Sequence, residues 1–246
     1  MICLKAIILA GGRGSRLGNL TDSLPKVLME INGTTIIERQ IKILNKIGIT
    51  DITLVTGYGA DLIKKNLSAY NVNLIQNEKY STTDTLYAFW LAKHCMDDEF
   101  LSFFGDAVFE EQILLNLLEK KNADICLAVE KSACNKEDVK VILSNDLITR
   151  IEAYRSESPT TISVNSANAK FIGIAKFTLT GAQIFKNTLN NFAKNGELNG
   201  DIARVLDVIS LQKKCVYAQI VNDLVWFNVN RNSDLDMARK YFTSKT

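Results

Sequence analysis

The sequence predicts an α/β protein of Rossmann-like, three-layer architecture, with helices on both faces of a mixed but mostly parallel sheet. Three observations lead to this fold class. Short apolar runs that are typical of buried strands alternate with helix-forming segments through the first half of the chain. The first apolar run, residues 6–9, opens into the glycine-rich segment LAGGRGSRL. A later run, FLSFF, ends in Gly105 and Asp106, and parallel sheets bind ligands at such strand ends.

In the first half, strands and helices follow one another closely. Apolar runs predict strands at 6–9, 51–57, 72–76, 100–106 and 125–130, and amphipathic segments predict helices at 34–47, 60–70, 83–93 and 110–121. The apolar residues of the helix at 34–47 recur with helical spacing. Thr34 or Thr35 can cap its N-terminus, and Gly48 ends it. Strands that alternate with helices in this way imply parallel pairing with right-handed crossovers.

Beyond Lys131 the pattern changes. Strands are expected at 139–143, 147–153, 171–177, 215–221 and 224–229, helices at about 181–194, 200–210 and 234–242, and a polar loop at 154–170. The chain contains no internal repeat, low-complexity tract or linker. We therefore predict one domain, residues 1–246, in two halves that meet near residue 130.

Composition and charge exclude several classes of protein. Hydrophobic residues make up 47% of the chain and charged residues 23%, as in an ordinary globular protein. The formal net charge is +2 with scattered basic residues, which argues against nucleic acid or a membrane surface as partner. No apolar stretch reaches the roughly 20 residues that span a bilayer, and the opening apolar run is too short for a signal peptide. We expect a cytoplasmic location.

Cysteine and histidine offer little chemistry. The five cysteines are an odd number, form no CxxC pair and mostly have apolar neighbours, which favours buried thiols in a reducing compartment. With a single histidine, His94, a zinc site is disfavoured. His94 lies near the carboxyl end of a predicted helix, where an imidazole interacts favourably with the helix dipole. Histidine-dependent acid–base or nucleophilic catalysis is therefore disfavoured.

The glycine-rich segment has the features of a polyphosphate site. Its glycines allow backbone N–H groups to approach an anion, because no Cβ obstructs them. Arg13 and Arg16 add permanently charged donors for phosphate oxygens, and Lys26 follows a turn at Pro25. An ordinary tight turn between strand and helix would need neither two arginines nor so many residues.

Two other glycine-rich loops do not fit. A P-loop requires a Lys-Ser or Lys-Thr pair after the glycines, and none is present here. A dinucleotide fingerprint requires a third glycine at the position of Leu17. The loop also stays irregular through Gly18 and Pro25, where a helix would have to begin.

Asp106 and two late asparagines are candidate metal ligands. Asp106 follows a buried strand and offers carboxylate oxygens to Mg²⁺, although it could instead cap a helix that begins near Val108. In the segment WFNVN, Asn228 and Asn230 share one face because side chains alternate along a strand. Their amide oxygens are neutral cation ligands.

These motifs resemble a known superfamily over nearly the whole chain. LAGGRGSRL, then LPKVLMEING, FFGD and WFNVN before a final helix are similar to the nucleotidyltransferases that activate sugar 1-phosphates. The segments LPKVLMEING, NEKYSTTDTLYAFWLA and KFIGIAKF look most like the small bacterial cytidylyltransferases of the phosphocholine type. Related enzymes act on phosphoglutamine, aminoethylphosphonate or inositol phosphate. The resemblance implies the nucleotide-diphospho-sugar transferase fold, with the nucleotide bound by about residues 1–130 and the acceptor by 131–246.

The resemblance also implies residue roles. Arg16, Lys26 and Asp106 would be catalytic, with Lys26 between the α-phosphate and the acceptor phosphate. Asp106 and Asn230, with Asn228 beside them, would bind Mg²⁺. The nucleotide would be held by Leu9, Ala10, Gly11, Gly12, Arg13, Gly14, Gln76, Asn77, Thr83, Asp84 and Gly105.

Several positions depart from the pattern of that family. Asp84 stands where related enzymes often have asparagine; it could accept a hydrogen bond from the cytosine amino group or cap the following helix. Lys170 stands where the family often has an acid; if this position faces the acceptor, a cationic choline head is disfavoured and a differently charged acceptor is favoured. Asp201 could contact the acceptor or cap a helix. Glu152 and Arg155 lie where the family often has an acceptor-contacting lysine.

The sequence leaves three functions open. The first is a Mg²⁺-dependent cytidylyltransferase that joins CTP to a small phosphorylated acceptor, releases pyrophosphate and serves surface polysaccharide or headgroup biosynthesis in a bacterium. The second is a sugar-1-phosphate nucleotidylyltransferase that uses UTP or dTTP. The third is a nucleotide-binding regulatory module without catalysis. A homo-oligomer remains possible, and the acceptor is not specified, because variable loops build such pockets.

Overall fold

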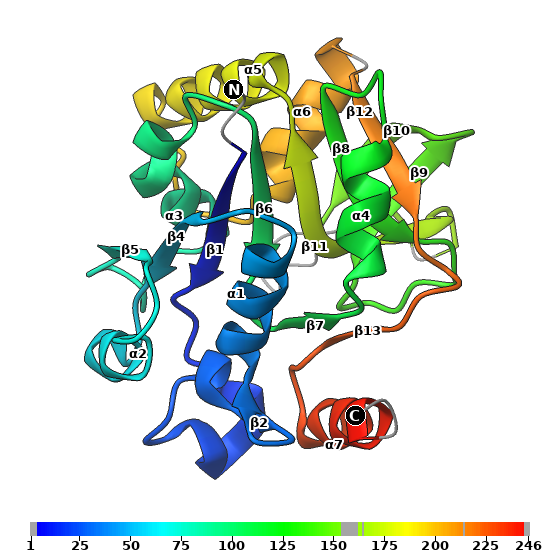
Figure 1. Ribbon diagram of the computed structural model, residues 1–246. Coiled ribbons are helices and arrows are strands. Elements are labelled where there is room, and N and C mark those ends of the chain that lie inside the picture. The colour runs from blue at the N-terminus through cyan, green and yellow to red at the C-terminus, as the bar shows by residue number, and fades with distance from the viewer. Residues whose placement is uncertain (1–3, 154–161, 164, 214, 244–246) are drawn as a thin grey trace.

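A nine-stranded mixed sheet forms the centre of the computed structural model, which describes residues 4–153, 162–163, 165–213 and 215–243 (Figure 1). The strand order is β5-β4-β1-β6-β11-β8-β12-β10-β9. The strands are β1 (Lys5–Ala10), β4 (Asp51–Thr56), β5 (Asn73–Gln76), β6 (Phe100–Phe104), β8 (Ile125–Glu130), β9 (Val139–Ser144), β10 (Leu147–Glu152), β11 (Ala169–Phe177) and β12 (Val216–Ile220).

Strand direction sets where the ends of the strands meet. Strands β5, β4, β1 and β6 are paired in parallel, as are β8 and β12. Strands β10 and β11 run against their neighbours in the sheet. The carboxyl ends of β1, β4 and β6 therefore lie at one edge, where parallel sheets place their ligands.

Helices cover both faces of this sheet, as the sequence predicts. On one face, α1 (Ile36–Lys46), α2 (Ala60–Asn66) and α4 (Gln112–Glu119) contribute to one buried apolar cluster. On the other face, α3 (Thr85–Leu91), α5 (Leu179–Lys194) and α6 (Ala203–Lys213) contribute to a second. Figure 1 shows α1 and α4 in front of the sheet, with α5 and α6 behind it.

A third, smaller cluster joins the two ends of the chain. It contains residues of α7 (Asn232–Thr243), of the hairpin β2 (Glu30–Ile31)–β3 (Thr34–Thr35), and of the antiparallel pair β7 (Ala107–Phe109)–β13 (Trp226–Asn228). Arg239 of α7 donates its Nε–H to the carbonyl oxygen of Glu30 at 3.1 Å. Figure 1 shows α7 beside β2, below the sheet.

Most predicted elements are present with shifted ends, and one prediction is wrong. No helix begins near Val108: residues 107–109 form β7, because their backbone pairs with β13. Asp106 therefore does not cap a helix there. The helix predicted at 60–70 ends at Asn66, and the helix predicted at 200–210 is Ala203–Lys213. Thr35, one of the two predicted caps, closes a capping box with Glu38 at the start of α1.

The cysteines that the structure describes are all free thiols. Cys126 and Cys134 are buried, as expected, and Cys95 and Cys215 are half-buried. Cys3 lies outside the described residues. Within the described ranges, none of the helices combines the length and apolar character that a bilayer span requires.

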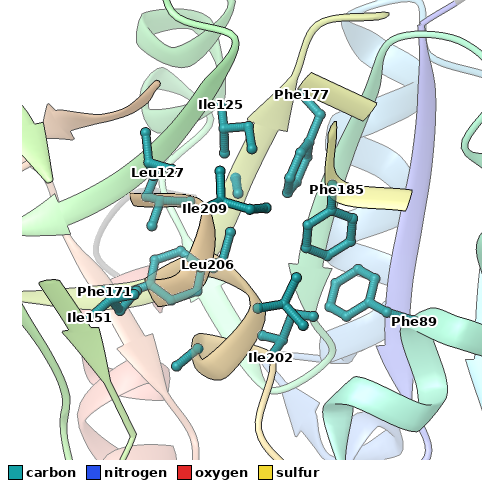
Figure 2. Close-up of a cluster of buried hydrophobic side chains, with 14 of the residues drawn as sticks. Phe89, Ile125, Leu127, Ile151, Phe171, Phe177, Phe185, Ile202, Leu206 and Ile209 are labelled. Carbon is teal, nitrogen blue, oxygen red and sulfur yellow. The ribbon is translucent and has the colours of Figure 1, made fainter. Parts of the chain in front are cut away.

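Four phenylalanines pack where α3 and α5 meet the sheet. Figure 2 shows Phe185 between Phe177 and Phe89. The ring centroid of Phe185 is 4.8 Å from that of Phe177 and 5.5 Å from that of Phe89. Phe100 stacks on Phe177 at 4.3 Å. Phe185 of α5 is fully buried and contacts Phe89 of α3 and Phe177 of β11. It therefore links these two helices to the sheet.

We expect Phe185→Ala to lower the free energy of unfolding by about 3–5 kcal/mol, since it leaves a cavity among these rings. Urea unfolding measures this loss. Leu211→Ala is the matched control in α6, because Leu211 is 55% exposed, and it should change stability by less than about 0.5 kcal/mol. Equal effects of the two substitutions would contradict the assignment of Phe185 to the core.

Candidate active site

The glycine-rich loop leaves β1 and lies against the stem of Lys26. Gly14 has φ +75° and precedes the short 3₁₀ segment η1 (Ser15–Thr21). A Cβ on Gly14 would lie 2.9 Å from the Cβ of Lys26, so only glycine fits here without strain. Lys26 itself begins a second 3₁₀ segment, η2 (Lys26–Leu28), directly after Pro25. The loop and the lysine thus form one unit at the carboxyl edge of the sheet.

Asp106 stands on a turn that packs directly against β1. The backbone N–H of Gly105 donates to the carbonyl oxygen of Leu9 at 2.9 Å. A Cβ on Gly105 would lie 2.6 Å from that same oxygen and 2.9 Å from Cγ1 of Val27. Glycine is therefore required for this close approach.

Two further elements hold the same turn. Buried Gln40 of α1 donates its Nε2–H groups to the carbonyl oxygens of Phe104 at 3.0 Å and Ala107 at 2.7 Å. The backbone N–H of Val229 donates to the carbonyl oxygen of Asp106 at 3.0 Å. Side chain and backbone thus fix the position from which the Asp106 carboxylate projects.

Lys26, Asp106 and Asn230 form one hydrogen-bonded cluster. The Lys26 ammonium donates to Oδ2 of Asp106 at 2.6 Å and to Oδ1 of Asn230 at 3.0 Å. The side chains of Lys26 and Asp106 are 12% and 17% exposed, so water screens this pair less than a surface pair. Residues from both ends of the chain therefore meet at one point.

Two of the three predicted metal ligands, Asp106 and Asn230, belong to this cluster, and the third, Asn228, lines the same cavity. Asn228 and Asn230 line the same cavity as Asp106, as the strand period predicts. Oδ1 of Asn228 is buried and has no hydrogen-bond partner in the described part of the chain. Among the residues that the structure describes, no group of three histidine, cysteine or acidic side chains could hold a metal. The available donor set is one carboxylate and two amide oxygens, and hard cations such as Mg²⁺ accept such oxygens together with substrate phosphates.

Two adjoining cavities open at this edge of the sheet. The smaller, of about 200 Å³, lies between the glycine-rich loop and the start of α3. The larger, of about 600 Å³, extends toward β13 and the β8–β9 connection. The side chain of Asp106 lines both, as do Asp84, Thr85 and Phe104. The arrangement can therefore hold two ligands that meet at Asp106.

Most residues predicted to bind the nucleotide line the smaller cavity. These are Leu9, Gly11, Gly12, Asn77, Thr83, Asp84 and Gly105, together with the predicted catalytic Lys26 and Asp106. The cavity lining does not include Ala10, Arg13, Gly14 or Gln76. Ala10 is buried and Gln76 is exposed at the end of β5.

The two loop arginines point to different places. Arg13 donates to Asp22 at 3.1 Å and lies over the ring of Tyr58, away from both cavities. Arg16 lines the larger cavity and donates to Glu137 at 3.2 Å. Arg231 donates to both oxygens of the same carboxylate, at 2.9 and 3.0 Å. Glu137 thus bridges the glycine-rich loop and the end of β13.

Asp84 and Asp201 each cap a helix and also line the larger cavity. Oδ1 of Asp84 accepts the backbone N–H of Thr85 at 2.7 Å, at the start of α3. Oδ1 of Asp201 accepts the backbone N–H of Ala203 at 2.7 Å, at the start of α6. The capping interpretation is therefore confirmed for both, and their exposure to the cavity leaves ligand contact possible as well.

The residues predicted for the acceptor are dispersed. Lys170 and Asp201 line the larger cavity. Glu152 lines neither cavity; its Oε2 accepts the backbone N–H of Ile162 at 2.8 Å. Arg155 lies outside the described residues. The acceptor roles of all four remain predictions.

Several site residues were missed from the sequence. Trp226 lines the larger cavity and lies two residues before Asn228, so the strand alternation that identified the asparagines could have identified it. Tyr80 lines the smaller cavity in a segment quoted only for its resemblance. The sequence offered no indication of a role for Gln40 or Glu137, because each forms hydrogen bonds with residues far away along the chain.

Comparison with known proteins now identifies the family. A family model, the MobA-like NTP transferase domain, matches residues 6–165, which include the glycine-rich loop, Lys26 and Asp106. The chain belongs to this family. It is a nucleotidyltransferase by this membership, and cytidylyltransferases are among its relatives.

Two relatives of this MobA-like transferase illustrate the similarity. The choline-phosphate cytidylyltransferase of Haemophilus influenzae is 32% identical over 160 residues, which are 63% of this chain and 65% of that protein. The match therefore spans slightly less than two thirds of that relative. The CTP:phosphoglutamine cytidylyltransferase of Campylobacter jejuni is 28% identical over 186 residues, 71% of this chain and 73% of that protein.

Solved structures establish the shared fold. The CTP:phosphocholine cytidylyltransferase of Streptococcus pneumoniae superimposes with a TM-score of 0.80 at 20% identity, over 98% of this chain and 100% of that one. The inositol-1-phosphate CTP transferase of T. maritima gives 0.76 at 21% identity, over 97% and 96%. The predicted fold of the nucleotide-diphospho-sugar transferase type is thereby confirmed.

We expect Gln40→Leu to destabilise this MobA-like transferase by about 1–3 kcal/mol, because two carbonyl oxygens beside Asp106 lose their buried donor. Chemical denaturation measures the change. Gln112→Leu makes the same substitution at an exposed position of α4, where the side chain bonds only to Asn116, and should cost less than about 0.5 kcal/mol. A stability loss in Gln112→Leu as large as in Gln40→Leu would refute the role given to Gln40.

Proposed function

We propose that this protein transfers the cytidylyl group of CTP to the phosphate of a small phosphorylated acceptor and releases pyrophosphate. The Lys26–Asp106–Asn230 cluster at the junction of the two cavities is the observation that carries the proposal. A reaction between two bound anions needs a cation where they meet, and Lys26 supplies it.

The smaller cavity fits the nucleotide. Gly11 and Gly12 line it and bring main chain without a Cβ to the cavity, and Asn77, Thr83 and Asp84 add polar side chains to its lining. The carboxylate of Asp84 has the acceptor chemistry that pairs with the cytosine amino group. The curated relatives named above act as cytidylyltransferases, which supports CTP over other nucleotides.

The larger cavity fits the acceptor. Its lining is polar and charged around one aromatic wall, and it adjoins the smaller cavity at Asp106. An acceptor phosphate near Asp106 and Lys26 would lie next to the α-phosphate of a nucleotide in the smaller cavity. The remainder of the acceptor would extend toward Lys170 and Trp226.

The chemistry requires alignment and charge neutralisation rather than a strong base. An oxygen of the acceptor phosphate attacks the α-phosphorus, and the bond from that phosphorus to the bridging oxygen of the β-phosphate breaks, so that pyrophosphate leaves. The attacking oxygen is already ionised at neutral pH. Lys26 orients both phosphates and offsets their repulsion, and such electrostatic contributions typically account for about 10²–10³ in rate each.

The donor set near Lys26 also fits Mg²⁺. Asp106, Asn228 and Asn230 would hold the ion, and the buried, unpartnered Oδ1 of Asn228 is the observation that favours this assignment. A bound Mg²⁺ would supply charge neutralisation of the phosphate oxygens. Asp106 and Asn230 now accept hydrogen bonds from Lys26, so the ammonium and the ion would share these two oxygens.

We expect Lys26→Ala and Asp106→Asn each to lower kcat for pyrophosphate release at least 10²-fold. Lys26→Ala removes the cation that offsets the repulsion between the two anions, and Asp106→Asn removes the carboxylate that would hold Mg²⁺. A coupled pyrophosphate assay with CTP, Mg²⁺ and a panel of phosphorylated acceptors measures this. Removal of divalent cations with EDTA should abolish turnover in the unmodified protein. Thermal melting checks that both variants remain folded.

Lys42→Ala and Asp61→Asn, at exposed positions of α1 and α2, are the matched controls and should retain full activity. A kcat above one tenth of the unmodified value in either site variant would refute the proposed roles. Preference for UTP or dTTP with sugar 1-phosphates would instead identify the second function. Nucleotide binding without pyrophosphate release under any condition would identify a regulatory module.

Arg16 lines the larger cavity, but by family resemblance the loop that carries it wraps the triphosphate of the nucleotide. We expect Glu137→Gln to tighten CTP binding about 2–5-fold at low salt, because Arg16 is then no longer paired with a carboxylate. The effect is modest since both side chains are about half exposed, and salt should diminish it. Isothermal titration calorimetry measures the change, with Glu119→Gln on the exposed face of α4 as control. Unchanged or weaker binding in Glu137→Gln would show that Arg16 does not meet the nucleotide.

A further inference from the structure

Lys170 places a positive charge in the larger cavity between a carboxylate and an aromatic ring. It stands near the start of β11, and its Nζ lies 3.4 Å from Oε2 of Glu130 on β8. The same Nζ lies 5.3 Å from the ring centroid of Trp226 on β13. All three side chains line the cavity that we assign to the acceptor.

A carboxylate beside the face of a tryptophan is a favourable site for an ammonium ligand. In this protein the Lys170 ammonium occupies that position, because it contacts both Glu130 and Trp226. A quaternary ammonium head that approached Trp226 would meet the like charge of Lys170. The cavity therefore disfavours a cationic acceptor at this wall.

The N–H groups of the Lys170 ammonium have no hydrogen-bond acceptor among the described residues. The side chain is only 19% exposed. The separation of 3.4 Å from Glu130 is longer than the 2.7–2.9 Å typical of a charge-assisted hydrogen bond. An ammonium has three N–H donors, so an incoming oxygen anion would satisfy groups that are otherwise poorly partnered.

A second lysine adds positive charge behind the first. Lys170 pairs across the sheet with Glu130 on one side and with Lys140 of β9 on the other, so their side chains share a face. Lys140 is 1% exposed, and its Nζ has no hydrogen-bond partner among the described residues. Like charges directly opposite each other are unfavourable. Glu152 of β10 stands opposite Lys140 in turn, so a carboxylate flanks this pair of lysines on each side.

The other charged residues that line the cavity also have partners. Arg16 and Arg231 are both paired with Glu137. Asp84 and Asp201 accept backbone N–H groups at the N-termini of α3 and α6, and Asp138 and Asp234 accept backbone N–H groups in the loops beside the cavity. Among the cations that line this cavity, Lys170 is the one that has an ion-pair partner but makes no hydrogen bond within the described residues.

On the basis of the proposed function, we propose that the acceptor is a phosphorylated compound whose head carries a carboxylate, and that Lys170 selects it. The carboxylate lies against the Lys170 ammonium while the phosphate lies at Lys26 and Asp106. Lys170 is thus a specificity-determining residue that acts on the acceptor and not on the nucleotide.

Pairs of acceptors that differ only at the carboxylate test this selection. O-phosphoserine is compared with phosphoethanolamine, and 3-phosphoglycerate with glycerol 3-phosphate; phosphocholine represents the quaternary ammonium head. We expect kcat/KM with CTP to favour the carboxylate member of each pair at least 10-fold, with phosphocholine among the poorest acceptors.

Lys170→Met keeps the apolar stem of the side chain and removes its charge. We expect it to reduce the carboxylate preference to less than 3-fold, through the KM of the acceptor, with the KM of CTP unchanged. Lys170→Glu should reverse the preference toward phosphocholine. Lys64→Met and Lys64→Glu make the same charge changes at an exposed position of α2 and should leave the preference intact. Thermal melting confirms that each variant is folded.

Calorimetric titration of the same acceptors, with and without the α,β-methylene analogue of CTP, separates this proposal from the proposed function. A carboxylate preference in binding without turnover would refute cytidylyl transfer and support the role of Lys170. Turnover with equal preference for both members of each pair, or a preference unaffected by Lys170→Met, would overturn the role of Lys170 and leave cytidylyl transfer standing.

Discussion

The main-chain turn at Gly105 and Asp106 is the constraint on which the site depends. It is held by β1 through Leu9, by α1 through Gln40 and by the segment between β13 and α7 through Val229. A carboxylate on a freely moving loop would have to be ordered before it could act, at a cost in conformational entropy. Here the surrounding elements have already fixed it, so Lys26 and Asn230 meet it at hydrogen-bonding distance.

Each basic side chain that faces the larger cavity is paired with an acid of the chain. Arg16 and Arg231 share Glu137, and Lys170 lies beside Glu130. Basic groups crowded at one edge of a sheet would otherwise repel one another. The pairs at Arg16 and Arg231 are exposed and individually weak, so an anionic ligand can replace the carboxylate without a large loss. The protein thus keeps its binding cations close together in the absence of a ligand.

Local signals predicted the fold class and several residues that line the two cavities, and they failed where distant residues decide the structure. The period of side chains along WFNVN predicted that Asn228 and Asn230 share a face, and both line the larger cavity. The glycine-rich loop follows β1 at the carboxyl edge of the sheet, and Gly11 and Gly12 line the smaller cavity, whereas their roles toward a ligand remain predictions. Residues 107–109 were not predicted to form a strand, because nothing in AVF indicates that its partner strand lies more than a hundred residues later. Gln40 and Glu137 escaped notice for the same reason: their hydrogen bonds reach 64 to 121 residues along the chain.

The contact between α7 and the β2–β3 hairpin has a consequence for biosynthesis. Because Asn230 and the helix behind it come from the last part of the sequence, a nascent polypeptide that has exposed only β1 to β12 still lacks one wall of the acceptor cavity and one partner of Lys26. The contact between Lys26 and Asn230 can therefore form only after translation has passed Asn230.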